Sequence, residues 1–250
     1  MESPVVACVL VIGNEILSGR TQDANLKHLA LTLNEWGVRV TEARVIPDIE
    51  AVIVATVNEV RRRFDYVFTT GGIGPTHDDI TAECIAKAFD RPLVEHPAIA
   101  ERMRRREAPP EVMAARLRMA RVPEGAGLIE NATGGPQGFY LENVYVMAGI
   151  PFVMENMLAT LQGSLKTGLP VRSRSVTAHL GESQIAVPLG EIQARYPHVD
   201  LGSYPFAREG RFGTTLVMRG TDGAALDRIL EEVKAAIVAG GAVPEDVRSE

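Results

Sequence analysis

The sequence has few cysteines, no long apolar run and no excess of positive charge. Its two cysteines, Cys8 and Cys84, lack the spacing of a metal site and provide no disulfide framework. The formal net charge is −6, from 26 Lys and Arg against 32 Asp and Glu, so no general field attracts nucleic acid or anionic lipid. These shortages predict a protein of the cytoplasm, where thiols stay reduced, with neither nucleic acid nor a membrane as partner.

The apolar run Val5 to Ile12 is too short to span a bilayer, and no basic leader-like segment precedes it. It is continuous and rich in β-branched residues, as is typical of a central parallel strand covered on both faces. No internal repeat and no low-complexity tract follows it. The run is therefore expected to be the first buried strand of a globular domain.

Helical and strand patterns alternate after this run. Apolar residues at helical spacing end at Trp36, and Gly37 supplies a stop. The predicted elements that follow the first strand are a helix over 22–36, a strand over 38–46, a helix over 49–60 and a strand over 65–70. This βαβαβ order predicts a parallel sheet with right-handed crossovers, whose ligands bind outside the carboxyl ends of the strands.

The rest of the chain divides into the end of this domain and a smaller one. Helices are expected over 97–107, 111–121 and 152–165, with strands over 139–141 and 144–147 between them. Beyond 166 the predicted order is a strand (173–180), a helix (182–196), strands (199–205 and 214–219) joined by a turn at Gly210 to Gly213, and a helix (223–239). The fold class is α/β, a mostly parallel sheet sandwiched by helices over 1–166, with a small α+β domain over 167–250.

The most informative segment is Thr69 to Asp79, between a predicted buried strand and a helix. Gly71, Gly72 and Gly74 lack β-carbons, so the backbone there can approach a ligand closely. The amides at the following helix N-terminus are expected to be free donors with a partial positive charge. The segment therefore predicts a site for a phosphate-bearing ligand.

Asp78 and Asp79 allow two interpretations. A carboxylate at a helix start can act only as a cap, which stabilises a helix by about 0.5–2 kcal/mol. Alternatively, one of the pair can help to hold a cation, because Mg²⁺ is usually bound by one or two carboxylates plus substrate phosphate oxygens. His77 could donate to a phosphate or transfer a proton, but it has no partner at the ligand spacing of zinc.

Two polar residues follow the first predicted strand. Glu15 can reach the same sheet edge as Asp79 and join an acidic cluster there, or it can be a solvated loop residue. Asn25 can bond a ligand amide or hydroxyl, or it can start a helix together with Asp23. Elsewhere one basic concentration is formed by the arginines at positions 102, 104, 105, 106, 116, 118 and 121. It can be a solvated helix face. Alternatively, it can guide an anionic substrate or face an acidic surface of another subunit.

Residues Thr69 to Asp79 resemble the signature of the molybdopterin-binding (molybdenum cofactor biosynthesis) domain family. Further motifs resemble its competence/damage-inducible protein A (CinA) branch, and these are Gly13 to Arg20, Asp23-Ala24-Asn25, Gly181-Glu182-Ser183 and Gly202 to Pro205. The resemblance runs from about Val9 to Ala236. Larger members of the branch append a C-terminal nicotinamide-nucleotide amidase domain, for which this sequence leaves no residues, so deamidation is not implied.

The resemblance implies a set of site residues. Asp48, Asp78 and Asp79 are the implied catalytic acids, and Asp48 and Asp79 the implied metal ligands; for Asp48 the alternative is a helix N-cap before Ile49. The implied ligand-binding residues are Gly13, Asn14, Glu15, Asn25, Thr70, Gly71, Gly72, Gly74, Gly149 and Pro151. The turn that holds the last two either faces the ligand or is an ordinary strand-to-helix loop, and Ala148 stands where the family usually has proline.

The sequence is compatible with three functions. The family branch implies hydrolysis of a nucleotide pyrophosphate such as ADP-ribose or FAD with a divalent metal such as Mg²⁺, which would activate a bound water. The alternative is a non-catalytic carrier of molybdopterin or another pterin, and the third is a scaffold whose acids only cap helices. Hydrolysis is preferred, because uncompensated carboxylates repel phosphate and a simple binder needs fewer of them. Relatives of the domain are commonly dimers or trimers, which implies a homo-oligomer.

Overall fold

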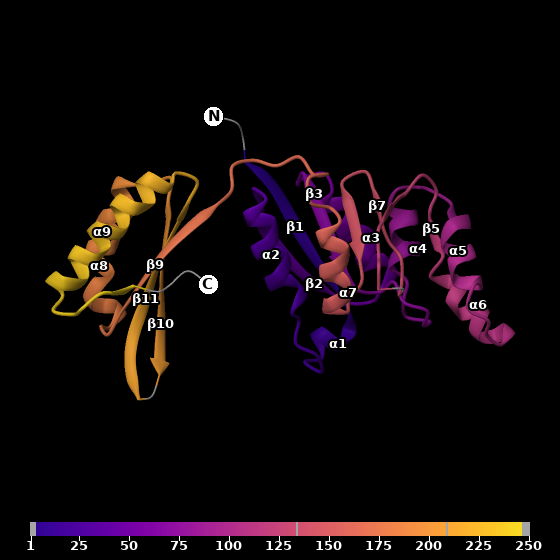
Figure 1. Ribbon diagram of the computed structural model, residues 1–250, viewed down its shortest axis with the longest axis horizontal. Coiled ribbons are helices and arrows are strands. Elements are labelled where there is room, and N and C mark those ends of the chain that lie inside the picture. The colour runs from indigo at the N-terminus through magenta and orange to yellow at the C-terminus, as the bar shows by residue number, and fades with distance from the viewer. Residues whose placement is uncertain (1–3, 134, 209, 247–250) are drawn as a thin grey trace. The chain divides into compact units, whose positions relative to one another are not determined.

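The computed structural model describes residues 4–133, 135–208 and 210–246. The chain folds into two compact units, Met1–Gly168 and Leu169–Glu250. Each unit has its own layers of helices and strands (Figure 1) and its own cluster of buried apolar side chains.

The first unit contains a six-stranded sheet in the order β2-β1-β3-β8-β7-β6. Its strands are β1 (Val5–Ile12), β2 (Val38–Ile46), β3 (Tyr66–Thr70), β6 (Gly127–Ile129), β7 (Gly138–Leu141) and β8 (Val144–Met147). The pairs β1–β2, β1–β3 and β3–β8 are parallel, whereas β7 pairs antiparallel with both β8 and β6. The mostly parallel sheet predicted from the sequence is confirmed.

Two pairs of helices cover the sheet, as Figure 1 shows. Helix α2 (Asn25–Glu35) contacts α7 (Pro151–Ala159), and α3 (Glu50–Val60) contacts α4 (Thr81–Ala88). The connection from β1 through α2 to β2 and the connection from β2 through α3 to β3 run in opposite directions along the sheet. Right-handed crossovers therefore place the two pairs of helices on opposite faces. β1 is therefore buried on both faces, and its Val9 and Leu10 are fully buried, as its continuous apolar sequence predicts.

Several short elements were not predicted. They are α1 (Asn14–Leu17), β4 (Leu93–Glu95) and β5 (Arg121–Pro123), and strand β6 of the main sheet was also missed. Each spans three or four residues, which is less than the length at which a helical or strand period can be recognised. Helices α5 (Pro97–Arg104) and α6 (Pro110–Arg118) lie between β4 and β5 and end earlier than predicted.

The second unit is a four-stranded antiparallel sheet with two helices. Its elements are β9 (Arg172–Ala178), α8 (Glu182–Arg195), β10 (Asp200–Arg208), β11 (Arg211–Gly220), α9 (Gly223–Ala239) and β12 (Glu245–Asp246), and the strand order is β10-β11-β9-β12. The smaller α+β unit is as predicted, but the turn expected over Gly210 to Gly213 is wrong, because β11 begins at Arg211. Gly213 is paired with Phe206 inside the hairpin, where a Cβ would lie 2.5 Å from the Phe206 ring.

No helix in the described part of the chain has the length and apolar character needed to cross a membrane.

Candidate functional site

The site residues predicted from the sequence lie on the loops that follow β1, β2, β3 and β8, at the carboxyl edge of the sheet. Two backbone hydrogen bonds join these loops, from the Gly13 amide to the Ile46 carbonyl (3.1 Å) and from the Gly71 amide to the Met147 carbonyl (3.2 Å). Loops that are distant in sequence are therefore held side by side. This is the edge at which parallel α/β sheets bind ligands.

The loop after β3 is fixed by two consecutive glycines. Gly71 has φ +102° and Gly72 has φ +68°, a region that favours glycine. A Cβ on Gly71 would lie 2.1 Å from the Ile12 carbonyl oxygen, and one on Gly72 would lie 2.1 Å from Thr81 Oγ1. Thr81 in turn donates its hydroxyl to the Gly71 carbonyl (3.0 Å) and its amide to the Gly72 carbonyl (2.9 Å). The first residue of α4 thus fastens the glycine pair.

The free amides lie only partly where the sequence suggested. The Thr81 amide at the start of α4 is bonded to the Gly72 carbonyl and is not free, whereas the amides of Ala82 and Glu83 in the same turn have no partner among the described residues. The amides of Gly72, Ile73 and Gly74 also have no hydrogen-bond partner among these residues. The free donors therefore extend from the glycine loop to the first turn of α4.

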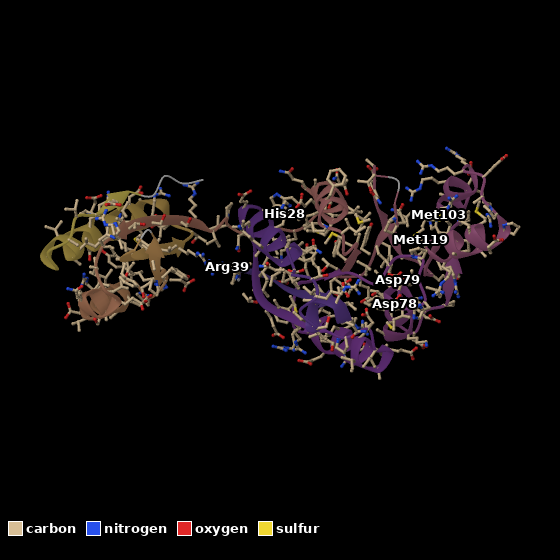
Figure 2. The ribbon with its side chains drawn as sticks, turned by 90° about the horizontal axis from the view of Figure 1, so that it is seen from below. His28, Arg39, Asp78, Asp79, Met103 and Met119 are labelled. Atoms are coloured by element: carbon tan, nitrogen blue, oxygen red, sulfur yellow. The ribbon has the colours of Figure 1, made fainter. Side chains whose placement is uncertain are left out.

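The amides of the glycine loop border a small hollow of about 20 Å³, here called the donor hollow. Its wall consists of Gly72, Ile73, Gly74, Asp79, Ala82, Arg118, Met119, Arg121, Gln137 and Phe139. Asp79 of the glycine loop and Met119 of the segment after α6 both line this hollow and are labelled in Figure 2. Two arginines of the basic concentration noted in the sequence, Arg118 and Arg121, thus reach the glycine loop.

Neither aspartate of the loop caps α4. The N-cap position of this helix is Ile80, and no described side chain forms a capping hydrogen bond there. Asp79 Oδ2 instead accepts the Thr76 amide (2.8 Å) and hydroxyl (2.5 Å), and the carboxylate covers Gly74, where a Cβ would lie 2.6 Å away. Asp78 is exposed, and its pKa is lowered chiefly by a hydrogen bond from the Thr76 side chain. Thr76 therefore interacts with both acids of the loop.

Asp48 connects the second loop to the first. It does not cap α3, because the N-cap of that helix is Ile49 with no side-chain cap among the described residues. Its Oδ2 accepts the Asn14 amide at 2.8 Å, at the start of α1. The pKa of Asp48 is raised, first by burial and further by the negative charges of Glu15 and Asp78, against the lowering effect of the Asn14 bond.

The acids share one electrostatic neighbourhood but do not form a preformed metal centre. In the part of the chain that the structure describes, no group of three or more His, Cys, Asp or Glu side chains is close enough together to hold a metal ion. Asp79 is engaged by Thr76, whereas Asp48 and Asp78 influence each other through charge. A cation here would need further ligands from outside the protein.

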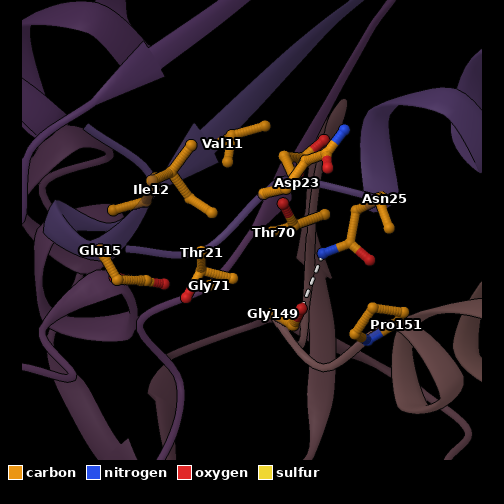
Figure 3. Close-up of a pocket in the computed structure, with 13 residues that line it drawn as sticks. Val11, Ile12, Glu15, Thr21, Asp23, Asn25, Thr70, Gly71, Gly149 and Pro151 are labelled. Atoms are coloured by element: carbon orange, nitrogen blue, oxygen red, sulfur yellow. Dashed lines mark hydrogen bonds between the residues drawn. The ribbon is translucent and has the colours of Figure 1, made fainter. Parts of the chain in front are cut away.

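A second hollow of about 70 Å³, here called the acceptor hollow, lies between the first loop and the start of α7 (Figure 3). It is lined by Val11, Ile12, Glu15, Ile16, Thr21, Gln22, Asp23, Ala24, Asn25, Thr70, Gly71, Gly149 and Pro151. Asn25 Nδ2 donates to the Gly149 carbonyl at 2.8 Å across this space. Asn25 Oδ1 and Thr70 Oγ1 are buried and have no partner among the described residues.

The predicted site residues therefore divide between two hollows. The acceptor hollow includes Glu15, Asn25, Thr70, Gly71, Gly149 and Pro151, and the donor hollow includes Gly72, Gly74 and Asp79. The remaining predicted residues, Gly13, Asn14, Asp48 and Asp78, line neither. Sequence reasoning missed the roles of Thr76 and Thr81 and the place of Gln137 in the wall of the donor hollow. Arg118 and Arg121 were visible as part of the arginine concentration.

This fold and glycine loop define the chain as a member of the molybdopterin-binding domain family: residues 8–167 match the family described as "Probable molybdopterin binding domain". Within that family it is similar to CinA and CinA-like proteins. Residues 170–246 match a different family, described as "FAD synthase, middle domain". The second unit is thus not an amidase.

Named relatives agree with this assignment. A protein of Archaeoglobus fulgidus is 34% identical over 79% of this chain and 84% of its own length. A CinA-like protein of Gemmatimonas aurantiaca is 34% identical over 74% of this chain but only 46% of its own length, so the chain spans about half of such relatives. The crystal structure of CinA from Thermoplasma acidophilum, 28% identical, covers 64% of this chain and 98% of its own with a TM-score of 0.59.

Proposed function

We propose that this chain binds a phosphate-bearing nucleotide or pterin, with the phosphate at the mouth of the donor hollow. The observation that carries this proposal is the set of three unpartnered amides, at Gly72, Ile73 and Gly74, in a hollow that Arg118 and Arg121 also line. Successive free amides make an anion-binding concavity. Arginine adds charge-assisted, often bidentate, hydrogen bonds to phosphate.

The donor hollow is also prepared before a ligand arrives. The conformations of Gly71 and Gly72 and their two bonds to Thr81 fix the loop, so little ordering cost remains for binding. The local positive character contrasts with the formal net charge of −6. Because the whole chain repels anions weakly, selection of a phosphate depends on this local group of donors.

The family supplies the class of ligand. The first unit belongs to a family named for molybdopterin binding, and the second matches the middle domain of FAD synthase. A pterin phosphate and a flavin or adenine nucleotide all join a phosphate to a nitrogen heterocycle. Either unit name therefore supports a phosphorylated heterocycle as ligand.

Hydrolysis of a nucleotide pyrophosphate, of the ADP-ribose or FAD type, is our second candidate function. It is favoured by the position of Asp48, whose pKa is raised first by burial and then by the nearby negative charges of Glu15 and Asp78. The described side chains do not form a complete site for a divalent ion, but Mg²⁺ is often held by one or two carboxylates together with substrate phosphate oxygens. Asp48 and Asp78 are the residues that would hold it, and such an ion would make a bound water more nucleophilic.

Calorimetry with ADP-ribose and FAD tests the binding function, using the native chain and an Arg118→Gln/Arg121→Gln double variant. Losing two charged donors should weaken binding by at least about tenfold. The matched control is Arg104→Gln/Arg105→Gln, which makes the same change in net charge but removes ion pairs to Glu95 and Glu101 instead. Equal weakening in both double variants, or no binding by the native chain, would contradict the proposal.

Release of AMP in the presence and absence of Mg²⁺ separates hydrolysis from a non-catalytic carrier. If the second candidate function is correct, AMP appears only with the metal, and an Asp48→Asn/Asp78→Asn variant releases at least about a hundredfold less. Tight binding without AMP release under any condition would identify the chain as a carrier.

A further inference from the structure

The acceptor hollow contains two polar side chains that lack partners. Asn25 is 4% exposed and Thr70 is 1% exposed, and their Oδ1 and Oγ1 atoms have no hydrogen-bond partner among the described residues. The bond from Asn25 Nδ2 to the Gly149 carbonyl fixes the direction of the Asn25 amide. Buried acceptors without partners are costly to a fold. Asn25 Oδ1 therefore lacks a donor, and the Thr70 hydroxyl, which can accept or donate, lacks any partner among the described residues.

The other lining groups have the same chemical character. Glu15 contributes a carboxylate, which folds back over Gly13 so closely that a Cβ there would lie 2.6 Å from its Oε1. Asp23 contributes a second carboxylate, one oxygen of which accepts the Leu26 amide at 2.9 Å. Carboxylates repel phosphate. This hollow therefore suits a group with N–H donors and not a second phosphate.

The size of the hollow limits what it can hold. Its volume of about 70 Å³ is several times the 10–15 Å³ that one water needs, but far below the roughly 300–1,000 Å³ of a pocket for a whole ligand. The space fits one edge of a heterocyclic ring. The remainder of such a ligand would lie outside it.

The two hollows are joined by one peptide bond. Gly71 lines the acceptor hollow and Gly72 lines the donor hollow, and consecutive Cα atoms are about 3.8 Å apart. One ligand can therefore place its phosphate against the amides of residues 72–74 and a ring edge against Asn25 and Thr70.

We propose that the acceptor hollow is a recognition subsite for the N–H-bearing edge of the ligand's heterocycle, with Asn25 Oδ1 and Thr70 Oγ1 as the accepting atoms. This inference rests on the proposed binding function, because the phosphate at the mouth of the donor hollow anchors the same ligand. It makes Asn25 and Thr70 the residues that distinguish an amino- or lactam-bearing ring from a ring without N–H groups and from a bare sugar phosphate.

Three probes with the same phosphate test this subsite by calorimetry: GMP, purine riboside 5′-monophosphate and ribose 5-phosphate. The guanine of GMP has the same lactam and amino groups on its six-membered ring as a pterin, whereas the unsubstituted purine has no exocyclic donor. The native chain should bind GMP at least about tenfold more tightly than purine riboside 5′-monophosphate, since buried acceptors reject a ligand that leaves them unpaired. Ribose 5-phosphate reports the phosphate anchor alone.

The variant Thr70→Val removes the hydroxyl and keeps the shape, so it should not lower the melting temperature. The preference for GMP should fall about fivefold, with no change for ribose 5-phosphate. The matched control is Thr69→Val, which removes another buried, unpartnered hydroxyl from the neighbouring position of β3, where the side chain points to the opposite face and lines neither hollow. It should leave the preference unchanged. Asn25→Leu is the second variant and should reduce the preference in the same way.

The outcomes separate the two proposals. If all three probes bind equally, or if Thr70→Val and Asn25→Leu keep the full preference, the subsite is refuted and the phosphate-binding function stands. Loss of the preference in Thr69→Val as well would also refute it, because the effect would not be specific to the hollow. If no probe binds the native chain, both proposals fail.

Discussion

The donor hollow and the acceptor hollow lie on either side of the Gly71–Gly72 peptide, yet their chemistry is opposite. Within the described part of the chain, the first combines Arg118 and Arg121 with amides that have no partner. The second combines Glu15 and Asp23 with an amide oxygen and a hydroxyl that have no partner among the described residues. A binding site can therefore be found by asking which groups the fold has not satisfied, and not only by where the largest space lies.

The largest expected effect on stability and binding comes from a substitution at the glycine pair between the hollows. Gly71→Ala forces a Cβ to within 2.1 Å of the Ile12 carbonyl oxygen at φ +102°, so the free energy of unfolding should fall by about 3 kcal/mol and both hollows should lose their ligand contacts. Chemical denaturation and calorimetry measure the two effects.

Gly125→Ala is the control for this variant, because Gly125 also has a positive φ (+83°) but no atom within 4 Å of an added Cβ. Its cost should be limited to the backbone term of about 1 kcal/mol. Equal destabilisation by the two substitutions would show that the close approach to Ile12 does not matter.

A smaller effect should follow from freeing an acid in the donor hollow. Thr76→Val keeps the side-chain shape but removes the hydroxyl that donates to Asp79. With less of its charge engaged, the Asp79 carboxylate should weaken phosphate binding by about three- to fivefold. The pKa of Asp78, which the Thr76 side chain lowers, should rise toward its ordinary value, as an NMR titration of the carboxyl would show. Thr76→Ser keeps the hydroxyl and should restore both properties.

The smallest effect concerns Asp48, beside the acceptor hollow's Glu15. Because folding raises the pKa of Asp48, its protonated form stabilises the fold at low pH, and this stability is lost as the pH rises through the raised value. Asp48→Asn should therefore be more stable than the native chain at pH 7 by less than about 1 kcal/mol, and the difference should vanish near pH 3. Urea unfolding across this range measures it.

Asp78→Asn should give the opposite sign. Folding lowers the pKa of Asp78, so the charged form favours the fold above the ordinary pKa and the contribution disappears as the pH falls. The variant should be slightly less stable than the native chain at neutral pH. If both variants shifted stability in the same direction, the assigned causes of the two pKa shifts would be wrong.

The sequence predicted the elements whose apolar pattern is long. β1, β2 and α9 begin and end at the predicted residues, because a run such as Val5–Ile12 has one buried environment throughout. The short strand β8 was also predicted, because all four of its residues are apolar. The three-residue strands β4, β5 and β6 are defined by their partners and not by a period. Long-range polar bonds were equally inaccessible. Asp48 accepts the Asn14 amide across 34 positions, and Asn25 donates to the Gly149 carbonyl across 124. The sequence identified both residues as candidate site residues but not their partners.

The glycine loop shows the same limit within a correctly located site. Its position after β3 followed from pattern, whereas the bond from the Thr81 amide to Gly72 and the free amides of Gly72 to Gly74 did not. Whether a given amide is free depends on tertiary partners that the local sequence does not specify. The interpretation of Asp78 and Asp79 as α4 caps failed for the same reason.

The two hollows draw their side chains from different stretches of the chain. Arg118 and Arg121 belong to the end of α6 and the start of β5, while Glu15 and Asn25 belong to the first loop and the start of α2. The two linings meet at the glycine pair, where Gly71 borders one hollow and Gly72 the other. Under the proposed binding mode, substitutions in the first loop would change which heterocycle is recognised without rebuilding the phosphate anchor, whereas a substitution in the glycine pair would disturb both hollows.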